Sequence, residues 1–488
     1  MDSENPLVGN IEECFSEQIS TLALKEAIEL VSNDRDDRFN YLSFSIQIPT
    51  VDTLAVLEQN GKTDTFQYYW EKPSDKFSIA AAGSVYRLKT TGEQRFREAS
   101  DQGKQLLDQV YHLSNIKHSL ASVHLLGGFS FFDHNIGKEW RDFGAGSFTL
   151  PEWLLVKKDD LTILTITKKI SNSKSLDENL EAYTSCLNKL EKICDAGTYK
   201  TDVEESFNSR IKVPEKASDE YNKWVHSVEN ATDLIKSDQF KKIVLARQLK
   251  IELHQPASAT KILNHLRNQY PDCYTFMVSQ DGKSAFLGST PERLASFNDR
   301  NIETEGLAGS ISRGKTASED AALEYRLLHS QKDLNEHAFV LDAIEENLQK
   351  YSDVFEHPVT PRIKKLSNVQ HLYTPVHATI KDGVSRTEVL SRLHPTPAVG
   401  GYPRDAAMPF INKLEHFDRG WYAAPVGWIN AGGNGEFVVA IRSGLLKNNE
   451  VRFYAGCGIV ENSDPHKEWE ETNLKFIPML TALEYARK

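Results

Sequence analysis

Charged side chains and glycines lie close together near the carboxyl-terminal end of the sequence. Gly456 and Gly458 follow a short apolar, strand-like run, so the backbone there can approach a ligand without an obstructing Cβ. Glu468, Glu471 and Lys475 follow at spacings of three and four residues, which places them on one face of a predicted helix. Backbone N–H groups, carboxylates and an ammonium group at one strand–loop–helix junction suit a small anion bound with a divalent cation. A solvated helix with ion pairs along one face is the alternative.

Lys242 and Glu292 are each predicted at the end of a buried strand, a place where residues of a site are common. Lys242 begins the apolar run KIVLA, and Glu292 follows the turn GSTP after another apolar run. A lysine whose pKa is lowered by burial can act as a general base, and a carboxylic acid can be its partner. The alternatives are structural: a lysine at a sheet edge whose stem reaches solvent, and a glutamate in the first turn of a helix.

Glu336 lies in the segment QKDLNEHAFVLDAI, which on its own has the pattern of a polar helix face. The neighbouring His337 belongs to no HxxxH or HExxH pattern, so zinc is not predicted. Carboxylates from different helices, without a set of cysteines or histidines, favour a hard ion such as magnesium. Glu336 is therefore either a candidate ligand of such an ion or a residue of a solvated helix.

A segment rich in proline and glycine, LHPTPAVGGYP at residues 393–403, is predicted to form a rigid loop. Such a loop is either a structural turn or part of the wall of a site. Arg442 ends the apolar run VVAI and is predicted to be buried. A buried arginine needs a carboxylate partner, and a bound ligand can supply that carboxylate.

The elements that must position these residues are predicted from the spacing of apolar residues. The predicted helices are residues 1–40, 95–113, 218–235, 260–268, 319–350 and a segment that begins at Pro465. The predicted strands include residues 42–48, 77–82, 123–132 (a strand pair or one bulged strand), two runs within 150–166, 243–246, 274–278, 285–287, 438–442 and 451–454. Because strands and helices do not alternate regularly, we predict an α+β fold with mostly antiparallel sheets and helices packed outside.

Composition limits the classes of partner. The chain has 488 residues and a net charge of −12, without a basic block or a zinc-finger spacing, so nucleic acid is not expected as a partner. Its five cysteines are scattered and form no CxxC pattern, which favours reduced thiols and a cytoplasmic location. The amino-terminal segment lacks the pattern of a signal peptide, and no apolar run reaches the roughly 18 residues of a membrane span.

A polar stretch at residues 168–216 is the best candidate for a boundary within the chain. It divides a variable amino-terminal half, residues 1–216, from residues 217–488, which carry the candidate site. Both halves are expected to form one compact unit.

Seven motifs in the same order resemble those of the chorismate-utilising enzymes, which include the anthranilate, aminodeoxychorismate, salicylate and isochorismate synthases. The motifs are KIVLAR (242–247), FLGSTPERL (286–294), EGLAGSISR (305–313), QKDLNEH (331–337), HPTPAVGGYP (394–403), IRSG (441–444) and YAGCGIVENSDPHKEWEETNLK (454–475). The resemblance is strong from residue 218 onward, and GGFSFF and LPEWLL resemble the family's variable amino-terminal half. It implies that residues 217–488 are the chorismate-binding catalytic half.

Within this family the sequence resembles the isochorismate synthases most. Ala398 in HPTPA matches them, whereas branches that expel pyruvate tend to carry threonine there. Anthranilate-type enzymes tend to carry glutamine in place of Lys242 and to have PAGT in place of HPTPA. A salicylate synthase, which forms isochorismate and then releases pyruvate, is the alternative within the family. A catalytically silent chorismate-binding protein is the alternative from another class, and the presence of Lys242, Glu292, Glu336 and Glu471 argues against it.

The resemblance implies a role for each matching residue. Lys242 would be the general base that activates water for attack on ring carbon C2, and Glu292 the general acid that protonates the departing C4 hydroxyl. Glu336 and Glu471 would hold magnesium, which binds the ring carboxylate, with Glu468 as a direct or water-mediated ligand. Proton donation near neutral pH requires that the pKa of Glu292 be raised, which is an expectation about its surroundings.

The resemblance also implies how the substrate is held. Arg442 and the backbone at Gly456 and Gly458 would bind the enolpyruvyl carboxylate, with Lys475 as a further cationic partner. Other positions that match the lining of the family's pocket are Gly309, Ser310, His371, Thr374 and Ala398. Because chorismate is a dianion and the chain is net negative, the site must be locally positive.

The expected cofactor is Mg²⁺ and the expected partner is chorismate alone, with no nucleic acid and no membrane. We expect a monomeric, cytoplasmic isomerase. Menaquinone biosynthesis is the favoured destination of its product, and siderophore and salicylate biosynthesis remain open at this point.

Overall fold

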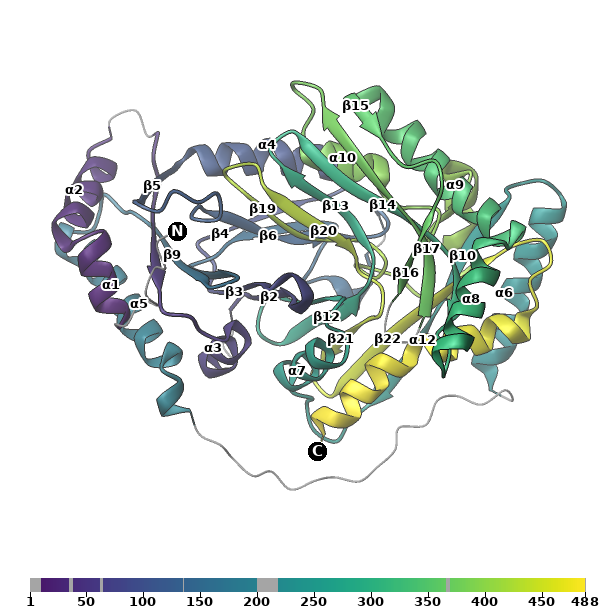
Figure 1. Ribbon diagram of the computed structural model, residues 1–488. Helices are drawn as coiled ribbons and strands as arrows, with labels where there is room; N and C mark the ends of the chain where they lie inside the picture. The colour runs from purple at the N-terminus through teal and green to yellow at the C-terminus, as the bar shows by residue number, and fades with distance from the viewer. Residues whose placement is uncertain are drawn as a thin grey trace.

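Two large β-sheets form the centre of the molecule, and helices cover them from outside (Figure 1). The computed structural model describes residues 10–34, 38–61, 65–134, 136–199, 218–365 and 369–487. Nearly every pair of neighbouring strands is antiparallel, although β1 and β5 are parallel. The predicted α+β class with mostly antiparallel sheets is therefore confirmed.

The larger sheet has 12 strands. In spatial order they are β18 (Gly401–Tyr402), β10 (Lys242–Glu252), β22 (Glu450–Ile459), β21 (Ser443–Lys447), β12 (Ser284–Thr290), β11 (Tyr274–Ser279), β2 (Gln67–Lys72), β3 (Phe77–Ala82), β8 (Trp153–Lys158), β9 (Leu161–Lys169), β1 (Tyr41–Ile48) and β5 (Val110–Ser114). The predicted strands 274–278 and 285–287 are present as the antiparallel neighbours β11 and β12.

The second sheet has 10 strands. In spatial order they are β15 (Ser352–Glu356), β17 (Val369–Ile380), β14 (Asn301–Ser312), β13 (Arg293–Asn298), β20 (Gly435–Val439), β19 (Pro425–Asn430), β6 (His124–Phe129), β7 (Gly146–Leu150) and β4 (Tyr86–Thr90), and β16 (Arg362–Lys365) also pairs with β17.

Both sheets contain strands from either side of the predicted boundary at residues 168–216. In the larger sheet β2 pairs with β11, and in the second sheet β6 pairs with β19. The backbone hydrogen bonds of each sheet thus join early and late segments of the chain. The division into residues 1–216 and 217–488 stays a prediction about sequence variability.

The helices lie outside the sheets. They are α1 (Ile11–Gln18), α2 (Thr21–Ser32), α3 (Thr53–Asn60), α4 (Arg95–Asp108), α5 (Leu176–Cys194), α6 (Asp219–Lys236), α7 (Ala259–Gln269), α8 (Ala317–Leu328), α9 (Gln331–Leu348), α10 (Arg386–Leu393), α11 (Arg404–Leu414) and α12 (Pro465–Ala486). In Figure 1, α12 (yellow) runs along β22, while α1, α2 and α5 lie at the opposite end. Within the described residues, none of the helices is long and apolar enough to cross a bilayer.

Side chains of alternate direction along the larger sheet fill two separate cores. Trp70 faces the core between the two sheets, while its neighbour Tyr69 faces the core beneath the outer helices. Phe276 and Met277 divide in the same way. This alternation is what a strand with a period of two produces when both faces of its sheet are covered.

Several predicted element boundaries are wrong for identifiable reasons. The predicted helix 319–350 is two helices, because Ser330 caps α9 by accepting from the N–H of Asp333. In the described part of the predicted helix 1–40 there are likewise two helices, since Ser20 caps α2. The predicted helix 95–113 ends at Asp108 and is followed by β5. Residues 123–132 contain one strand, β6, and a Cβ at Gly127 would lie 1.9 Å from the carbonyl oxygen of Ser147, so close strand contact explains this glycine.

Candidate active site

Lys242 lies at the first position of β10, at one end of the larger sheet. Its side chain is buried, and a Cβ at Gly458 on the neighbouring strand would lie 2.7 Å from the Cε atom of Lys242. A side chain at position 458 would therefore require the end of the Lys242 side chain to move. The segment at residues 393–403 returns beside β10, where Val244 donates its N–H to the carbonyl of Gly400 at 2.8 Å.

Glu336 on α9 is the ionic partner of Lys242. The Nζ atom of Lys242 lies 2.6 Å from Oε1 of Glu336. Burial opposes ionisation of Glu336, but the charges of Lys242, Lys332 and Lys475 outweigh it and hold the pKa of that carboxyl below its usual value. The carboxylate from α9 and the ammonium group from β10 therefore form a charged, partly buried pair.

A second pair lies on α12, which begins where predicted. Asp464 caps this helix and Pro465 occupies its first position. Nζ of Lys475 lies 2.5 Å from Oε1 of Glu471 and donates to the carbonyl of Gly456 at 2.9 Å. We call the side chains of Lys242, Glu336, Glu471 and Lys475 the ion-pair end of the site.

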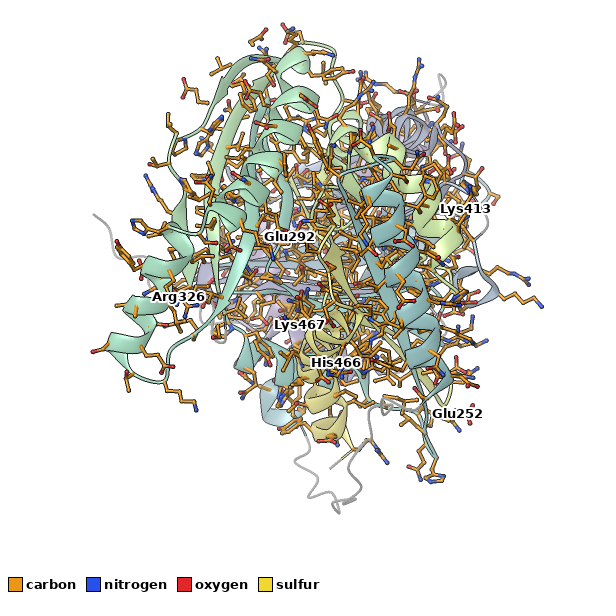
Figure 2. The ribbon with its side chains drawn as sticks, turned by 90° about the vertical axis from the view of Figure 1, so that its right-hand side faces the viewer. Glu252, Glu292, Arg326, Lys413, His466 and Lys467 are labelled. Carbon is orange, nitrogen blue, oxygen red and sulfur yellow. The ribbon has the colours of Figure 1, made fainter. Side chains whose placement is uncertain are left out.

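Glu292 lies in the interior, just beyond β12. Figure 2 shows it near the centre of the view, whereas Arg326, Lys413 and Glu252 lie toward the margins. Its Oε1 accepts from the hydroxyl of Thr396 at 3.3 Å. Burial, followed by the charge of Glu305, raises the pKa of Glu292 to about 7. The raised pKa that proton donation requires is thus present.

The charge next to Glu292 comes from a residue that sequence reasoning did not single out. Glu305 on β14 is buried, and its carboxylate binds Nζ of Lys364 on β16 at 2.9 and 3.1 Å. Glu305 begins the motif EGLAGSISR, so an acidic residue directly before an apolar run was the available signal. No local pattern indicates Lys364. We call Glu292, Glu305, Lys364 and Thr396 the carboxyl end of the site.

Arg442 lies between the two ends. Burial lowers the pKa of its guanidinium, while the charges of Glu292 and Glu471 act in the opposite direction. Its φ is 51°, a conformation that costs a residue with a Cβ free energy. Within the described part of the chain the guanidinium makes no hydrogen bond or ion pair, and it lines a cavity together with Ser289 and His371. A buried guanidinium of this kind can receive a carboxylate from a ligand.

Four further predicted pocket residues lie on the neighbouring strands β14 and β17, against which α9 packs. Gly309 has a φ of +71° at a bulge in β14, and the Oγ of Ser310 lies 2.7 Å from Nδ1 of His371. Burial, with Arg442 as the next cause, lowers the pKa of His371 to about 4, so the imidazole is neutral at pH 7. Thr374 has a different partner, since its hydroxyl lies 2.8 Å from Nε2 of the buried His337.

Ala398 lies in the loop that also carries Thr396, and this loop is fixed by a buried ion pair that the sequence did not reveal. Arg419 donates to the carbonyl of Val399 at 2.8 Å and to the carbonyl of Val244 at 2.9 Å. Glu415, its ionic partner at 2.6 Å, is almost fully buried too. Arg419 thus connects the loop to the strand that carries Lys242.

The predicted magnesium ligands do not form a preassembled cluster. Within the described residues, no three or more carboxylate, histidine or cysteine side chains lie close enough to hold a metal ion. The reason is that Glu336 turns to Lys242 and Glu471 to Lys475. The donor chemistry nevertheless fits a hard cation, because all three predicted ligands are carboxylates, and Glu471 is close enough to Glu468 for its charge to add to burial in raising the pKa of Glu468.

Gly456 and Gly458, whose backbone was predicted to bind a carboxylate, both lie in strand β22. Gly456 pairs with Ala246 and Gly458 with Val244 in the β10–β22 ladder. The carbonyl of Gly456 receives the ammonium group of Lys475. A role of these glycines in binding a carboxylate stays a prediction.

Comparison with known proteins gives a consistent result. A family model described as chorismate binding enzyme matches residues 23–484. Isochorismate synthase MenF of Bacillus subtilis is 33% identical over 451 residues, which are 91% of this chain and 93% of that protein. The salicylate biosynthesis isochorismate synthase of Pseudomonas aeruginosa is 35% identical over 455 residues, 92% of this chain and 91% of that protein.

The fold also matches a solved structure. The menaquinone-specific isochorismate synthase MenF from Escherichia coli superposes with a TM-score of 0.75 at 25% sequence identity. The match covers 94% of this chain and 99% of that chain.

Proposed function

This chain belongs to the chorismate-binding enzyme family, and from that premise we propose that it is an isochorismate synthase, an isomerase that converts chorismate reversibly to isochorismate. The observation that carries the proposal is the contrast within one site between Lys242, paired with Glu336 at a strand end, and Glu292, buried with its pKa raised to about 7. A base and an acid in one site are what the transfer of a hydroxyl group requires.

In the proposed reaction, Lys242 in its neutral form accepts a proton from water as the water oxygen attacks ring carbon C2. The ring double bonds shift, and the C4–O bond breaks as Glu292 donates its proton to the departing hydroxyl. One water molecule enters and one leaves, so the net change is an isomerisation. Release of the Glu336 contact when substrate arrives would free the lysine to act as a base.

The substrate carries two carboxylates, and the site offers separate cations. We assign the enolpyruvyl carboxylate to Arg442, whose guanidinium lacks a partner among the described residues and lines a cavity. Lys475, which donates to the carbonyl of Gly456 on β22, supports binding as a second positive charge. Such local cations offset the net charge of −12 that an anion meets at a distance.

Enzymes of this family use a divalent metal, and we propose Mg²⁺ for this chain. Glu336, Glu471 and Glu468 would hold it, in competition with the ammonium groups of Lys242 and Lys475 for the same oxygen atoms. When bound, the ion would neutralise the carboxylates and supply positive charge for the ring carboxylate of the substrate.

We further propose that the product serves menaquinone biosynthesis, because the similar solved structure from Escherichia coli is that of a menaquinone-specific enzyme. The relative named for salicylate biosynthesis supports salicylate as the alternative destination. The free thiols of all five cysteines support a cytoplasmic location. A monomer is the simplest assembly that supplies the whole site, since its residues all come from one chain.

Product analysis tests the proposal. Purified protein is incubated with chorismate and Mg²⁺, with and without EDTA, and the products are separated by chromatography. We expect isochorismate in equilibrium with chorismate, little pyruvate, and loss of activity in EDTA that magnesium restores. Pyruvate formed in step with chorismate loss would identify a salicylate synthase, and binding without turnover would identify a silent chorismate-binding protein.

A further inference from the structure

Two buried carboxyl groups lie on adjoining segments at the carboxyl end of the site. Glu305 Oε1 accepts from the backbone N–H of Arg293 at 3.4 Å, and Arg293 directly follows Glu292. Glu292 and Glu305 are each 8% exposed. Lys364 is bonded to both oxygens of Glu305, while Glu292 has the hydroxyl of Thr396 as its side-chain partner among the described residues. Glu305 therefore has a cation as its partner, whereas Glu292 has a neutral hydroxyl.

Glu305 forms an ion pair with Lys364, and the charge of its carboxylate acts on Glu292. Two neighbouring buried carboxyl groups resist joint ionisation, so the one without a cation retains its proton. The charged groups that face Glu292 are Glu305, which favours the protonated form, and Arg442 and Lys364, which oppose it. Burial acts in the same direction as Glu305.

We infer that Glu305, held by Lys364, is a positioning residue that keeps Glu292 protonated so that it can donate to the leaving hydroxyl. This inference rests on the proposed function, because it concerns the acid step of that reaction. Glu305 touches no reacting atom and acts through its charge. The alternative is that Glu305 only ties β14 to β13 through its bond to the N–H of Arg293, which would make its role structural.

The pH dependence of kcat/KM for isochorismate formation separates the two roles. In Glu305→Gln the negative charge is gone, so we expect the alkaline midpoint to fall by about one pH unit. With a midpoint near 7 in the parent enzyme, the rate should then fall about tenfold at pH 8 and only about twofold at pH 6. Glu305→Asp, which retains the charge, should keep the parent midpoint even if its rate is lower.

Glu303→Gln is the matched control. Glu303 is two residues away on the same strand, its carboxylate lies 3.3 Å from Arg293, and its side chain is 50% exposed. The substitution removes the same charge from the same strand and should leave the midpoint unchanged. A midpoint of Glu305→Gln equal to that of the parent, with a rate lowered equally at every pH, would overturn the inference.

Lys364→Gln removes the cation of the Glu305–Lys364 ion pair, and Lys364 is the more exposed of the two residues. This variant replaces Glu305→Gln if that variant fails to fold. Without the ammonium group, Glu292 and Glu305 together lose their remaining proton only at higher pH, because no positive charge offsets their mutual repulsion. The alkaline midpoint of kcat/KM should therefore rise. An unchanged or lower midpoint would count against the inference.

Infrared titration of the protonated carboxyl band, identified by its absence in Glu292→Gln, follows Glu292 without any turnover. If the parent protein makes no isochorismate but the band still titrates at lower pH in Glu305→Gln, the proposed function fails and the coupling stands. If isochorismate forms and the band does not move, the coupling fails alone.

Discussion

The ion-pair end and the carboxyl end both contain glutamates and lysines, but the pKa of a glutamate is lowered at the first end and raised at the second. At the ion-pair end Glu336 lies 2.6 Å from Lys242, and its pKa is held below the usual value. At the carboxyl end the lysine, Lys364, pairs with Glu305, and the neighbouring Glu292 has its pKa raised to about 7. The partner of each carboxyl group, rather than its burial alone, thus determines whether it is a counter-ion or a proton donor.

Removing the base should have the largest effect. We expect Lys242→Ala to lower kcat by roughly 10²- to 10⁴-fold, because the group that deprotonates water is lost. Lys241→Ala is the control, since that neighbouring lysine is exposed and paired with Asp238. Isochorismate formation under saturating chorismate measures the effect. A kcat within tenfold of the parent would show that the ion-pair end does not contain the base.

The guanidinium of Arg442 interacts electrostatically with Glu292 at the carboxyl end and with Glu471 at the ion-pair end. Its substitution therefore tests whether both ends act on one substrate. Lysine cannot form the two parallel hydrogen bonds of a guanidinium, so Arg442→Lys should lower kcat/KM by a factor equivalent to about 2–4 kcal/mol. The surface substitution Arg392→Lys, at a position 44% exposed, should change it by less than about twofold. Arg442 would lie outside the site if both variants behaved alike.

Glu471→Gln probes the cation proposed for the ion-pair end. Loss of one carboxylate oxygen donor should raise the magnesium concentration for half-maximal rate by about tenfold or more, with the fold intact. Glu470→Gln, one position along α12, is the control, and circular dichroism checks the helix content. Equal magnesium dependence in both variants would remove Glu471 from the proposed ligands.

The smallest expected effect is on the free energy of unfolding. Here a substitution in the active site, Glu292→Gln, should stabilise the protein. Because the folded-state pKa of Glu292 is raised, from 4.5 to about 7, its contribution to stability is complete below pH 4.5 and is lost as pH rises through 7. At pH 8, Glu292→Gln should therefore be more stable than the parent, by about 1–3 kcal/mol, and near pH 4 the difference should vanish.

Urea unfolding at the two pH values measures this difference. Glu252→Gln, at a side chain 81% exposed, is the control and should show no such pH dependence. A Glu292→Gln protein that is less stable than the parent at pH 8 would mean that the carboxyl group is well accommodated as an anion.

Sequence reasoning placed a residue correctly in the fold where its position depends on its immediate neighbours along the chain. Lys242 begins β10 and Glu292 follows β12, as the apolar runs beside them predicted, and α12 begins at Pro465, as predicted. Strand ends and helix caps are local signals, written within a few residues. The class of the fold follows from the order of such elements.

The missed features depend on long-range pairing. Glu305 and Lys364 are 59 residues apart and meet because β14 and β16 both pair with β17. Arg419 reaches Val244, 175 residues earlier, to fix the loop that carries Ala398. The orientation of Glu336 toward Lys242, rather than toward Glu471, is likewise set by which helix packs against which strand. No periodicity in the sequence encodes such contacts.

The mixed strand order of both sheets has a consequence for the synthesis of this protein. Strand β2 cannot complete its pairing until β11 has left the ribosome, about 200 residues later, which at typical rates of translation takes between about 10 and 40 s. Strand β6 waits longer still for β19. During that interval the unpaired edges of early strands are templates for association with other chains. The nascent amino-terminal half is thus the segment for which a chaperone would matter most.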